Sequence, residues 1–424
     1  MPKKPAEACV RVSARGAARL QARHPWVYRS DILEQNDVPP GAVVRVLDPR
    51  GKFLGTALYS SSSQIAIRMI SHTSVADLPA LVTRRIREAL AYRHGLVANT
   101  NAYRIVFSEA DFLPGLIVDR YNDILILQIL TQAMDAAPVR EAILQFLSNA
   151  NVGTAAPGCP DEQSSAVPAT SRDLIPASAS IVERTDPRIR ELEQLPPRPS
   201  ALLQGEKTST IITMNGDQST GVRLHYDALE GQKTGAFLDQ RENYAAAAQY
   251  ACGEALDVFC YQGGFALHLA RSCSSVTGVD SSRPALEMAE KNAALNAREL
   301  EWIEGNAFDL LRDYAAAERR YDTIVLDPPA FAKTKRDLDK ALGGYKELNL
   351  RAMKMLRPGG ILLTCSCSFH VGAEDFHKVL AAAAQDVHRS FHLIENRGAA
   401  RDHPILLNVP ETGYLKCMIL RVSG

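Results

Sequence analysis

Short apolar runs alternate with helical patterns from Glu254 onward, and this alternation constrains the fold more than any other feature of the sequence. The predicted strands cover residues 255–261, 275–280, 302–305, 323–327 and 361–365. Helical patterns lie between them at 284–296, with Pro284 at the first turn, and at 338–356, which ends before Arg357-Pro-Gly-Gly. The alternation predicts an α/β fold, a Rossmann-like doubly wound parallel sheet with helices on both faces.

The chain is expected to close this sheet with a C-terminal antiparallel hairpin. A helix near 374–384 is followed by the apolar runs 391–395 and 414–422, and no segment of helical length and period separates these two runs. Residues 215–424 are therefore predicted to form one domain, entered through a hairpin turn at Asn215-Gly216.

The first half of the chain has a different pattern. Strands bounded by Gly, Pro and Ser at 41–48, 51–59 and 64–70 predict a small β-barrel module within residues 1–93. Residues 94–214 predict an α+β central domain, with a Pro-Gly turn between two apolar runs, a strand at 124–130 and a helix at 138–147. Residues 151–178 are rich in Ala, Pro, Ser and Gly, which predicts a disordered insertion.

Charge and composition narrow the class of protein. The formal net charge is zero, yet residues 1–100 hold fifteen Lys and Arg against seven Asp and Glu, so that end is the candidate for phosphate contacts. A solvated basic surface explains the same balance equally well. The eight Cys are scattered without metal-ligand spacing, so no metal is expected. No apolar run reaches about 20 residues and the N-terminus has no signal pattern, so we expect a cytoplasmic protein without a membrane partner.

The residues just after the predicted strands indicate a nucleoside cofactor, because ligands of doubly wound sheets bind beyond the carboxyl ends of the strands. Gly263 and Gly264 follow the first strand, where a close backbone approach to a ligand and a plain tight turn are equally plausible readings. Asp280 ends the second strand, where a carboxylate accepts hydrogen bonds from ribose hydroxyls. Asn306 and Ala307 follow the third strand and suit an adenine ring.

Two further strand ends indicate methyl transfer to a base. The fourth strand runs into Asp327-Pro-Pro, a rigid loop that would fix the carboxylate against a planar group. Cys367 falls beyond the fifth strand, on the ligand side, whereas Cys365 within that strand is expected to be an apolar filler. Methylation of pyrimidine C5 needs a thiolate that adds at C6, and the N-terminus of the helix at 372–384 could favour that thiolate.

At these residues the sequence resembles the three-domain bacterial methyltransferases that make 5-methylcytosine in large-subunit (23S) ribosomal RNA. The likeness covers nearly the whole chain. His24-Pro-Trp-Val-Tyr-Arg and residues 51–60 resemble the family's RNA-binding PUA domain, and residues 109–121 resemble its central domain. The catalytic-domain signatures are similar to residues 231–243, 262–265, 280, 327–331, 366–368 and 402–404.

The resemblance implies S-adenosylmethionine as cofactor and Cys367 as nucleophile, with Asp327 contacting N3 or N4 of cytosine. The expected cofactor-binding residues are Gln240, Arg241, Asp257, Tyr261, Gly263, Gly264, Asp280, Asn306, Ala307 and Asp327. Asn306 departs from the family pattern, in which Asp is more usual, and the insertion at 151–178 is an addition to the common core.

Other functions remain open at the level of sequence. A guanine N-methyltransferase would share the Asp-Pro-Pro loop but would need no thiol. A PUA-type RNA-binding assembly factor without catalysis would have lost cofactor binding, against which Gly263, Gly264, Asp280 and Asp327 speak. A dehydrogenase is the most distant alternative. The expected partner is 23S ribosomal RNA or a ribosomal subunit precursor, and the sequence does not decide between a monomer and a homodimer.

Overall fold

The computed structural model describes residues 8–35, 37–149, 175–176, 179–230, 236–332 and 334–423. The chain divides into two compact units. Unit 1 comprises Met1–Thr210, Tyr226–Ala236 and Asp402–Thr412, and unit 2 comprises Ile211–His225, Phe237–Arg401 and Gly413–Gly424. The predicted disordered insertion at 151–178 lies almost entirely outside the described residues, as do residues 231–235. The boundaries of the three expected domains remain a prediction.

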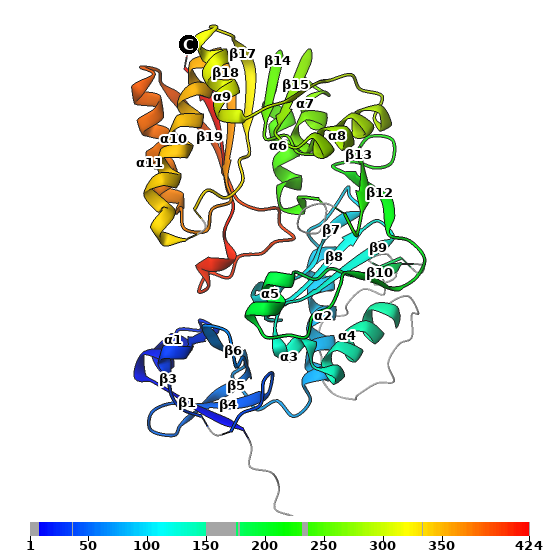
Figure 1. Cartoon of the computed structure of the whole chain (residues 1–424), viewed down its shortest axis with the longest axis vertical. Helices are drawn as coiled ribbons and strands as arrows, with labels where there is room; N and C mark the ends of the chain where they lie inside the picture. Colours follow the sequence, from blue (N-terminus) through cyan, green and yellow to red (C-terminus); the bar gives the residue numbers. More distant parts are fainter. Residues whose placement is uncertain are drawn as a thin grey trace, which may run out of the picture. The chain divides into compact units, whose positions relative to one another are not determined.

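Unit 1 begins with a six-stranded sheet in the order β2-β6-β5-β4-β1-β3. Its strands are β1 (Cys9–Val12), β2 (Trp26–Tyr28), β3 (Ile32–Gln35), β4 (Val43–Leu47), β5 (Phe53–Tyr59) and β6 (Ile65–Ser71). Figure 1 shows these strands curling around a common interior, as expected for a small barrel. The sequence did not reveal helix α1 (Ala14–Gln21), which packs over that interior; Ser13 caps it by accepting a hydrogen bond from the Gly16 N–H.

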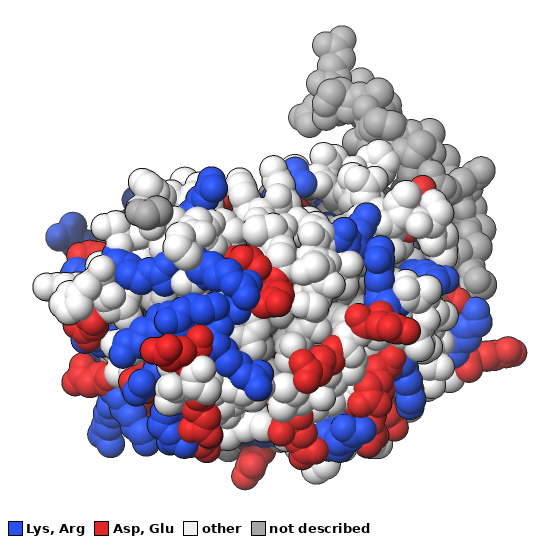
Figure 2. Space-filling view, turned by 90° about the horizontal axis from the view of Figure 1, so that it is seen from above, with Lys and Arg blue, Asp and Glu red and all other residues white. Residues whose placement is uncertain are grey.

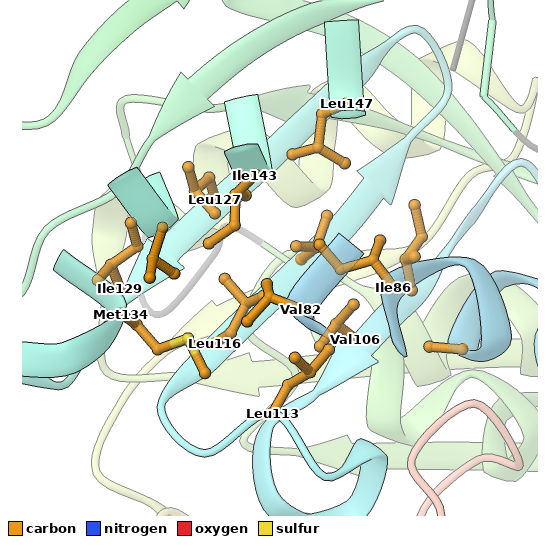
Figure 3. Close-up of a cluster of buried hydrophobic side chains, with 14 of the residues drawn as sticks. Val82, Ile86, Val106, Leu113, Leu116, Leu127, Ile129, Met134, Ile143 and Leu147 are labelled. Atoms are coloured by element: carbon orange, nitrogen blue, oxygen red, sulfur yellow. The ribbon is translucent and has the colours of Figure 1, made fainter. Parts of the chain in front are cut away.

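A second sheet of unit 1 has the order β11-β10-β9-β8-β7. It consists of β7 (Ala102–Phe107), β8 (Leu116–Tyr121), β9 (Ile124–Ile129), β10 (Ser180–Glu183) and β11 (Ala201–Gln204), with helices α2 (Leu78–His94), α3 (Gln132–Asp135), α4 (Ala137–Asn149) and α5 (Pro187–Leu192). Figure 3 shows Val82 and Ile86 of α2, with Ile143 and Leu147 of α4, packed against the sheet. This burial gives the unit an apolar core.

Unit 2 contains a seven-stranded sheet in the order β16-β15-β14-β17-β18-β20-β19. Its strands are β14 (Glu254–Val258), β15 (Ser275–Asp280), β16 (Glu301–Glu304), β17 (Tyr321–Leu326), β18 (Leu356–Ser366), β19 (Phe391–Arg397) and β20 (Lys416–Val422). The first five strands are parallel, and β20 is antiparallel to both β18 and β19. The predicted doubly wound sheet with a C-terminal antiparallel hairpin is therefore confirmed.

Helices cover both faces of this sheet. Figure 1 shows α6 (Arg241–Tyr250), α7 (Gly264–Leu269) and α8 (Arg283–Leu295) on one face, and α9 (Ala307–Ala316), α10 (Leu338–Met355) and α11 (Ala373–Asp386) on the other. Helix α8 has proline at its first turn, as the sequence indicated, and Ser282 caps it by accepting a hydrogen bond from the Ala285 N–H. A short hairpin, β12 (Ser209–Met214) with β13 (Val222–Asp227), precedes the sheet along the chain.

The start of β18 differs from the sequence prediction. Arg357-Pro-Gly-Gly was expected to separate helix from strand, but β18 begins directly at Leu356. The pairing with β17 jumps from Tyr321–Leu356 to Thr323–Ile361, so these residues form an irregularity inside the strand. Among the described residues, no helix is long and apolar enough to span a membrane.

Candidate active site

Five parallel strands of unit 2 bring the predicted site residues to one edge of the sheet. Since β14 to β18 share one direction, the turns that follow them all lie at their carboxyl ends. These turns carry, in chain order, Tyr261 with Gly263 and Gly264, then Asp280, Asn306, Asp327 and Cys367. Residues from a stretch of more than one hundred positions are thus gathered at one place.

The turn after β14 is tied to the end of β15. Tyr261 has a left-handed backbone with φ 50°, and its N–H donates to Asp280 Oδ2 over 2.9 Å. The other oxygen of Asp280 accepts the Ser282 N–H, also at 2.9 Å. Asp280 is half-buried at this edge, in the place expected for a ribose-binding carboxylate.

The two glycines of this turn are required by the packing of the protein itself. Gly263 has φ 84°, and a Cβ there would approach the Trp302 ring to 2.9 Å. A Cβ on Gly264 would lie 2.7 Å from the Tyr244 hydroxyl. Of the two readings that the sequence allowed, the tight turn therefore has direct structural support, and approach to a ligand stays a prediction.

Asp257 lies inside β14 and is fully buried. Its Oδ2 accepts the Ala266 N–H over 2.8 Å at the start of α7, and burial raises its pKa to about 8. Its Oδ1 has no hydrogen-bond partner among the described residues. A buried carboxyl oxygen without a partner is costly, and a donor on a bound ligand would satisfy it.

Asn306 is the N-cap of α9. Its side-chain oxygen accepts the N–H groups of Phe308 at 2.9 Å and Asp309 at 3.3 Å. That oxygen, which the sequence suggested for the adenine amino group, is therefore engaged with the helix in this structure. Ala307, the first residue of the helix, is buried directly beside it.

Asp327 is held by a chain of side-chain amides. Gln240 donates from Nε2 to Asp327 Oδ1 over 2.9 Å, and Asn243 donates from Nδ2 to Gln240 Oε1 over 2.7 Å. Both amides are buried. Gln240 therefore helps to fix the orientation of Asp327, the first residue of the Asp-Pro-Pro loop. Arg241 begins α6 and is also buried, with its guanidinium 3.5 Å from Glu242 Oε1.

Cys367 contacts the Asp-Pro-Pro loop directly. Its thiol lies 3.7 Å from the Pro328 carbonyl oxygen, a distance at which a thiol donates a hydrogen bond. The neighbouring Ser368 fastens the two loops, because its hydroxyl accepts the Ala332 N–H at 3.2 Å and bonds to the Tyr345 hydroxyl at 2.9 Å. Cys365 is fully buried in β18, consistent with an apolar filler.

Sequence reasoning missed Lys416, which opens β20 and is only 7% exposed. Its ammonium donates to the carbonyl oxygens of Ser368 and Tyr414, both at 2.7 Å. The available signal was a cation near the start of a mostly apolar strand, whose other cation, Arg421, lies near its end. Its place beside Cys367 could not be read from the pattern, because it depends on how β20 pairs with β18.

Family models match two parts of the chain. A PUA-like domain matches residues 10–72, and an S-adenosylmethionine-dependent methyltransferase matches residues 173–421. Two solved structures share the fold, each at 18% identity and covering 97% of this chain and 99% of their own: a methyltransferase complexed with SAH, with a TM-score of 0.78, and a SAM-dependent methyltransferase from Streptococcus mutans, with a TM-score of 0.76. The fold and the strand-end site thus define an S-adenosylmethionine-dependent methyltransferase with a PUA-like domain.

Curated relatives specify the family within this class. Ribosomal RNA large subunit methyltransferase I of Photobacterium profundum is 36% identical over 94% of this chain and 95% of its own length. The protein of the same name from Shewanella denitrificans is also 36% identical, over 95% and 96%. The chain therefore belongs to the ribosomal RNA large subunit methyltransferase I family, and its cofactor is S-adenosylmethionine.

Proposed function

We propose that this protein methylates C5 of a cytosine in large-subunit (23S) ribosomal RNA, through a covalent bond between Cys367 and C6 of the base. The family names the class of RNA but neither the base nor the atom. The observation that carries the finer assignment is the contact between the Cys367 thiol and the Pro328 carbonyl. A nucleophile beside the Asp-Pro-Pro loop has a use in carbon methylation, whereas methylation of a ring nitrogen requires none.

The cofactor would be held at the strand ends. Asp280 suits the ribose hydroxyls, Asn306 and Ala307 lie where the adenine is expected, and the unpartnered oxygen of Asp257 suits a ligand donor. The turn at Tyr261, Gly263 and Gly264 and the residue Arg241 complete the proposed set. Gln240, expected from the sequence in the same set, bonds to Asp327, and we propose that it orients that carboxylate instead. When bound, S-adenosylmethionine supplies an electrophilic methyl group on its sulfonium.

The chain's own residues would carry the remaining chemistry. The Cys367 thiolate forms a bond to C6, which places electron density on C5 so that C5 can take the methyl group. Asp327, oriented by Gln240, contacts N3 or N4 of the cytosine and steadies the ring. Removal of the C5 proton by a base then returns the electron pair, breaks the sulfur–carbon bond and releases the thiolate.

RNA binding would fall to the PUA-like domain at residues 10–72 and the central domain, while the target base is flipped into the site. The basic balance of residues 1–100 supports this assignment. The face drawn in Figure 2 carries Lys and Arg interspersed with Asp and Glu, so that face alone does not mark an RNA surface. We place the protein in the cytoplasm, with 23S RNA or a subunit precursor as substrate.

Mass spectrometry of 23S RNA from cells with and without the gene tests the proposal. Loss of a single 5-methylcytosine, restored by the wild-type gene, is the expected result. Loss of a methylguanine instead would favour guanine N-methylation, and an unchanged RNA with no binding of S-adenosylmethionine in calorimetry would favour an assembly factor.

A further inference from the structure

Lys416 is a buried cation, and its hydrogen-bond partners in the described part of the chain are neutral backbone carbonyls. Its ammonium bonds to two backbone carbonyl oxygens, and no carboxylate within the described part of the chain lies within ion-pair distance of it. Burying an ammonium without a counter-charge is costly, and an apolar residue is the usual occupant of such a strand position. A nearby anion would offset the energetic cost of burying this ammonium.

The backbone places that cation beside Cys367. Lys416 pairs with Ser366 in the β18–β20 ladder, so the first residue of β20 lies opposite the last residue of β18. Its side chain reaches past this pair to the carbonyl of Ser368. Cys367 is the residue between those two anchor points. An ammonium has three N–H donors, of which the carbonyls of Ser368 and Tyr414 use two.

We infer that Lys416 is a positioning residue that stabilises the thiolate of Cys367 by its charge. Its purpose in catalysis rests on the proposed function, but the position of Lys416 next to Cys367 does not depend on the substrate. Burial lowers the pKa of Lys416 to about 8, and the charge of Cys367 acts in the opposite direction by favouring the ammonium. At neutral pH the ammonium form therefore predominates, and attraction between the pair favours the thiolate in turn.

The negative charge of Asp327 would disfavour a thiolate near it, and a nearby cation would offset that effect. Burial, contact with Cys417 and, to a smaller extent, the negative charge of Asp327 raise the pKa of the neighbouring Cys365, so the charge of Asp327 acts on this strand. Burial raises the pKa of Tyr345, so its phenol is neutral at physiological pH. The charge of Cys367 acts on Lys416 of β20 and on Tyr345 of α10. Further titratable groups near it along the described chain include Asp327 after β17, Cys365 on β18, Cys417 on β20, and His370, Glu374 and Asp375 before and in the first turn of α11.

The test measures how fast iodoacetamide alkylates Cys367 as a function of pH, with each cysteine peptide quantified by mass spectrometry. It uses the full-length protein without RNA or cofactor, so it remains informative if methylation proves to be on guanine. Lys416→Met removes the charge at similar volume, and Lys416→Arg keeps it. Cys252, which is exposed, reports reagent activity, and Cys365, which is fully buried, reports loosening of the fold.

In the wild type we expect the thiol of Cys367 to titrate below its ordinary pKa of about 8.5. Lys416→Met should slow its alkylation at pH 7 about tenfold or more, while Lys416→Arg stays within about threefold of the wild type. A wild-type titration at or above the ordinary value would overturn the inference, even if the Met variant failed to fold. An unchanged Cys367 rate in Lys416→Met, with Cys365 still protected, would also overturn it.

Discussion

Gln240 donates its side-chain N–H to Asp327 over 2.9 Å, so a residue of the segment before the sheet sets the orientation of the carboxylate at the end of its fourth strand. Gln240 is in turn fixed by Asn243 through a 2.7 Å hydrogen bond. Because both amides are buried, they form a preformed network that holds the carboxylate of Asp327.

Gln240→Leu should therefore impair chemistry more than cofactor binding. We expect the kcat for RNA methylation to fall about 10- to 100-fold, because a misplaced catalytic group loses most of its effect. Affinity for S-adenosylmethionine in calorimetry should change less than about threefold. Gln249→Leu, an exposed change on α6, the helix that begins just after Gln240, is the matched control. Loss of cofactor affinity equal to the loss of kcat would show that Gln240 holds the cofactor instead.

Gly264→Ala should destabilise unit 2, because its Cβ would lie 2.7 Å from the Tyr244 hydroxyl and the buried ring has little room to move. We expect a loss of about 1–3 kcal/mol in the free energy of unfolding in urea. Gly343→Ala is the control, since nothing lies within 4 Å of its Cβ and the position is helical. That change should stabilise by about 0.5–1 kcal/mol. Equal effects of the two substitutions would contradict the packing argument.

Asp257 should make stability depend on pH. Burial raises the pKa of this carboxyl from 3.8 to about 8 in the folded protein, so between these values the folded state binds a proton that the unfolded state has lost. Its contribution to stability is present at low pH and decreases as the pH rises towards 8. Asp257→Asn, which cannot ionise, should therefore gain about 3–4 kcal/mol relative to the wild type between pH 5 and pH 8. Urea unfolding at both pH values measures this gain, and a constant difference would refute the assignment.

The buried side chain of Arg93 should contribute strongly to the stability of unit 1. It is fully buried, pairs with both carboxylate oxygens of Asp111, and donates to the Asp402 carbonyl at 2.9 Å. Arg93→Met leaves Asp111 as a buried charge without its partner and should cost about 3–5 kcal/mol in urea unfolding. Arg84→Met, on the same helix, removes an exposed pair with Glu88 and should change stability by less than about 0.5 kcal/mol. A loss at Arg93 as small as that at Arg84 would count against this network.

The strand ends of unit 2 could be predicted from sequence because a parallel sheet turns linear order into spatial proximity. Asp280, Asn306, Asp327 and Cys367 each follow an apolar run, and parallel pairing gathers the ends of such runs. What each side chain bonds to was not predictable in the same way. The oxygen of Asn306 caps its own helix, a local competition that the strand pattern does not reveal.

Features of the site that the sequence did not predict depend on pairing between segments distant in the chain. Lys416 reaches the carbonyl next to Cys367 because β20 inserts between β18 and β19, and no local pattern fixes that insertion. Likewise, Asp402–Thr412 belongs to unit 1 although its sequence neighbours on both sides belong to unit 2. The placement of these segments depends on how the whole chain packs, and hydrophobic periodicity in the sequence does not reveal that packing.

Trapping the covalent bond between Cys367 and C6 of the cytosine tests the proposed mechanism most directly. A 23S RNA fragment carrying 5-fluorocytosine has no C5 proton to lose, so an adduct at C6 should persist after methyl transfer and migrate with the protein in denaturing gels. We predict a cofactor-dependent adduct with the wild type and with Cys365→Ala, mapped by mass spectrometry to the peptide of Cys367. Cys367→Ala should form none. Methylation of unmodified RNA by Cys367→Ala at a rate near that of the wild type, with no adduct for any variant, would contradict the account.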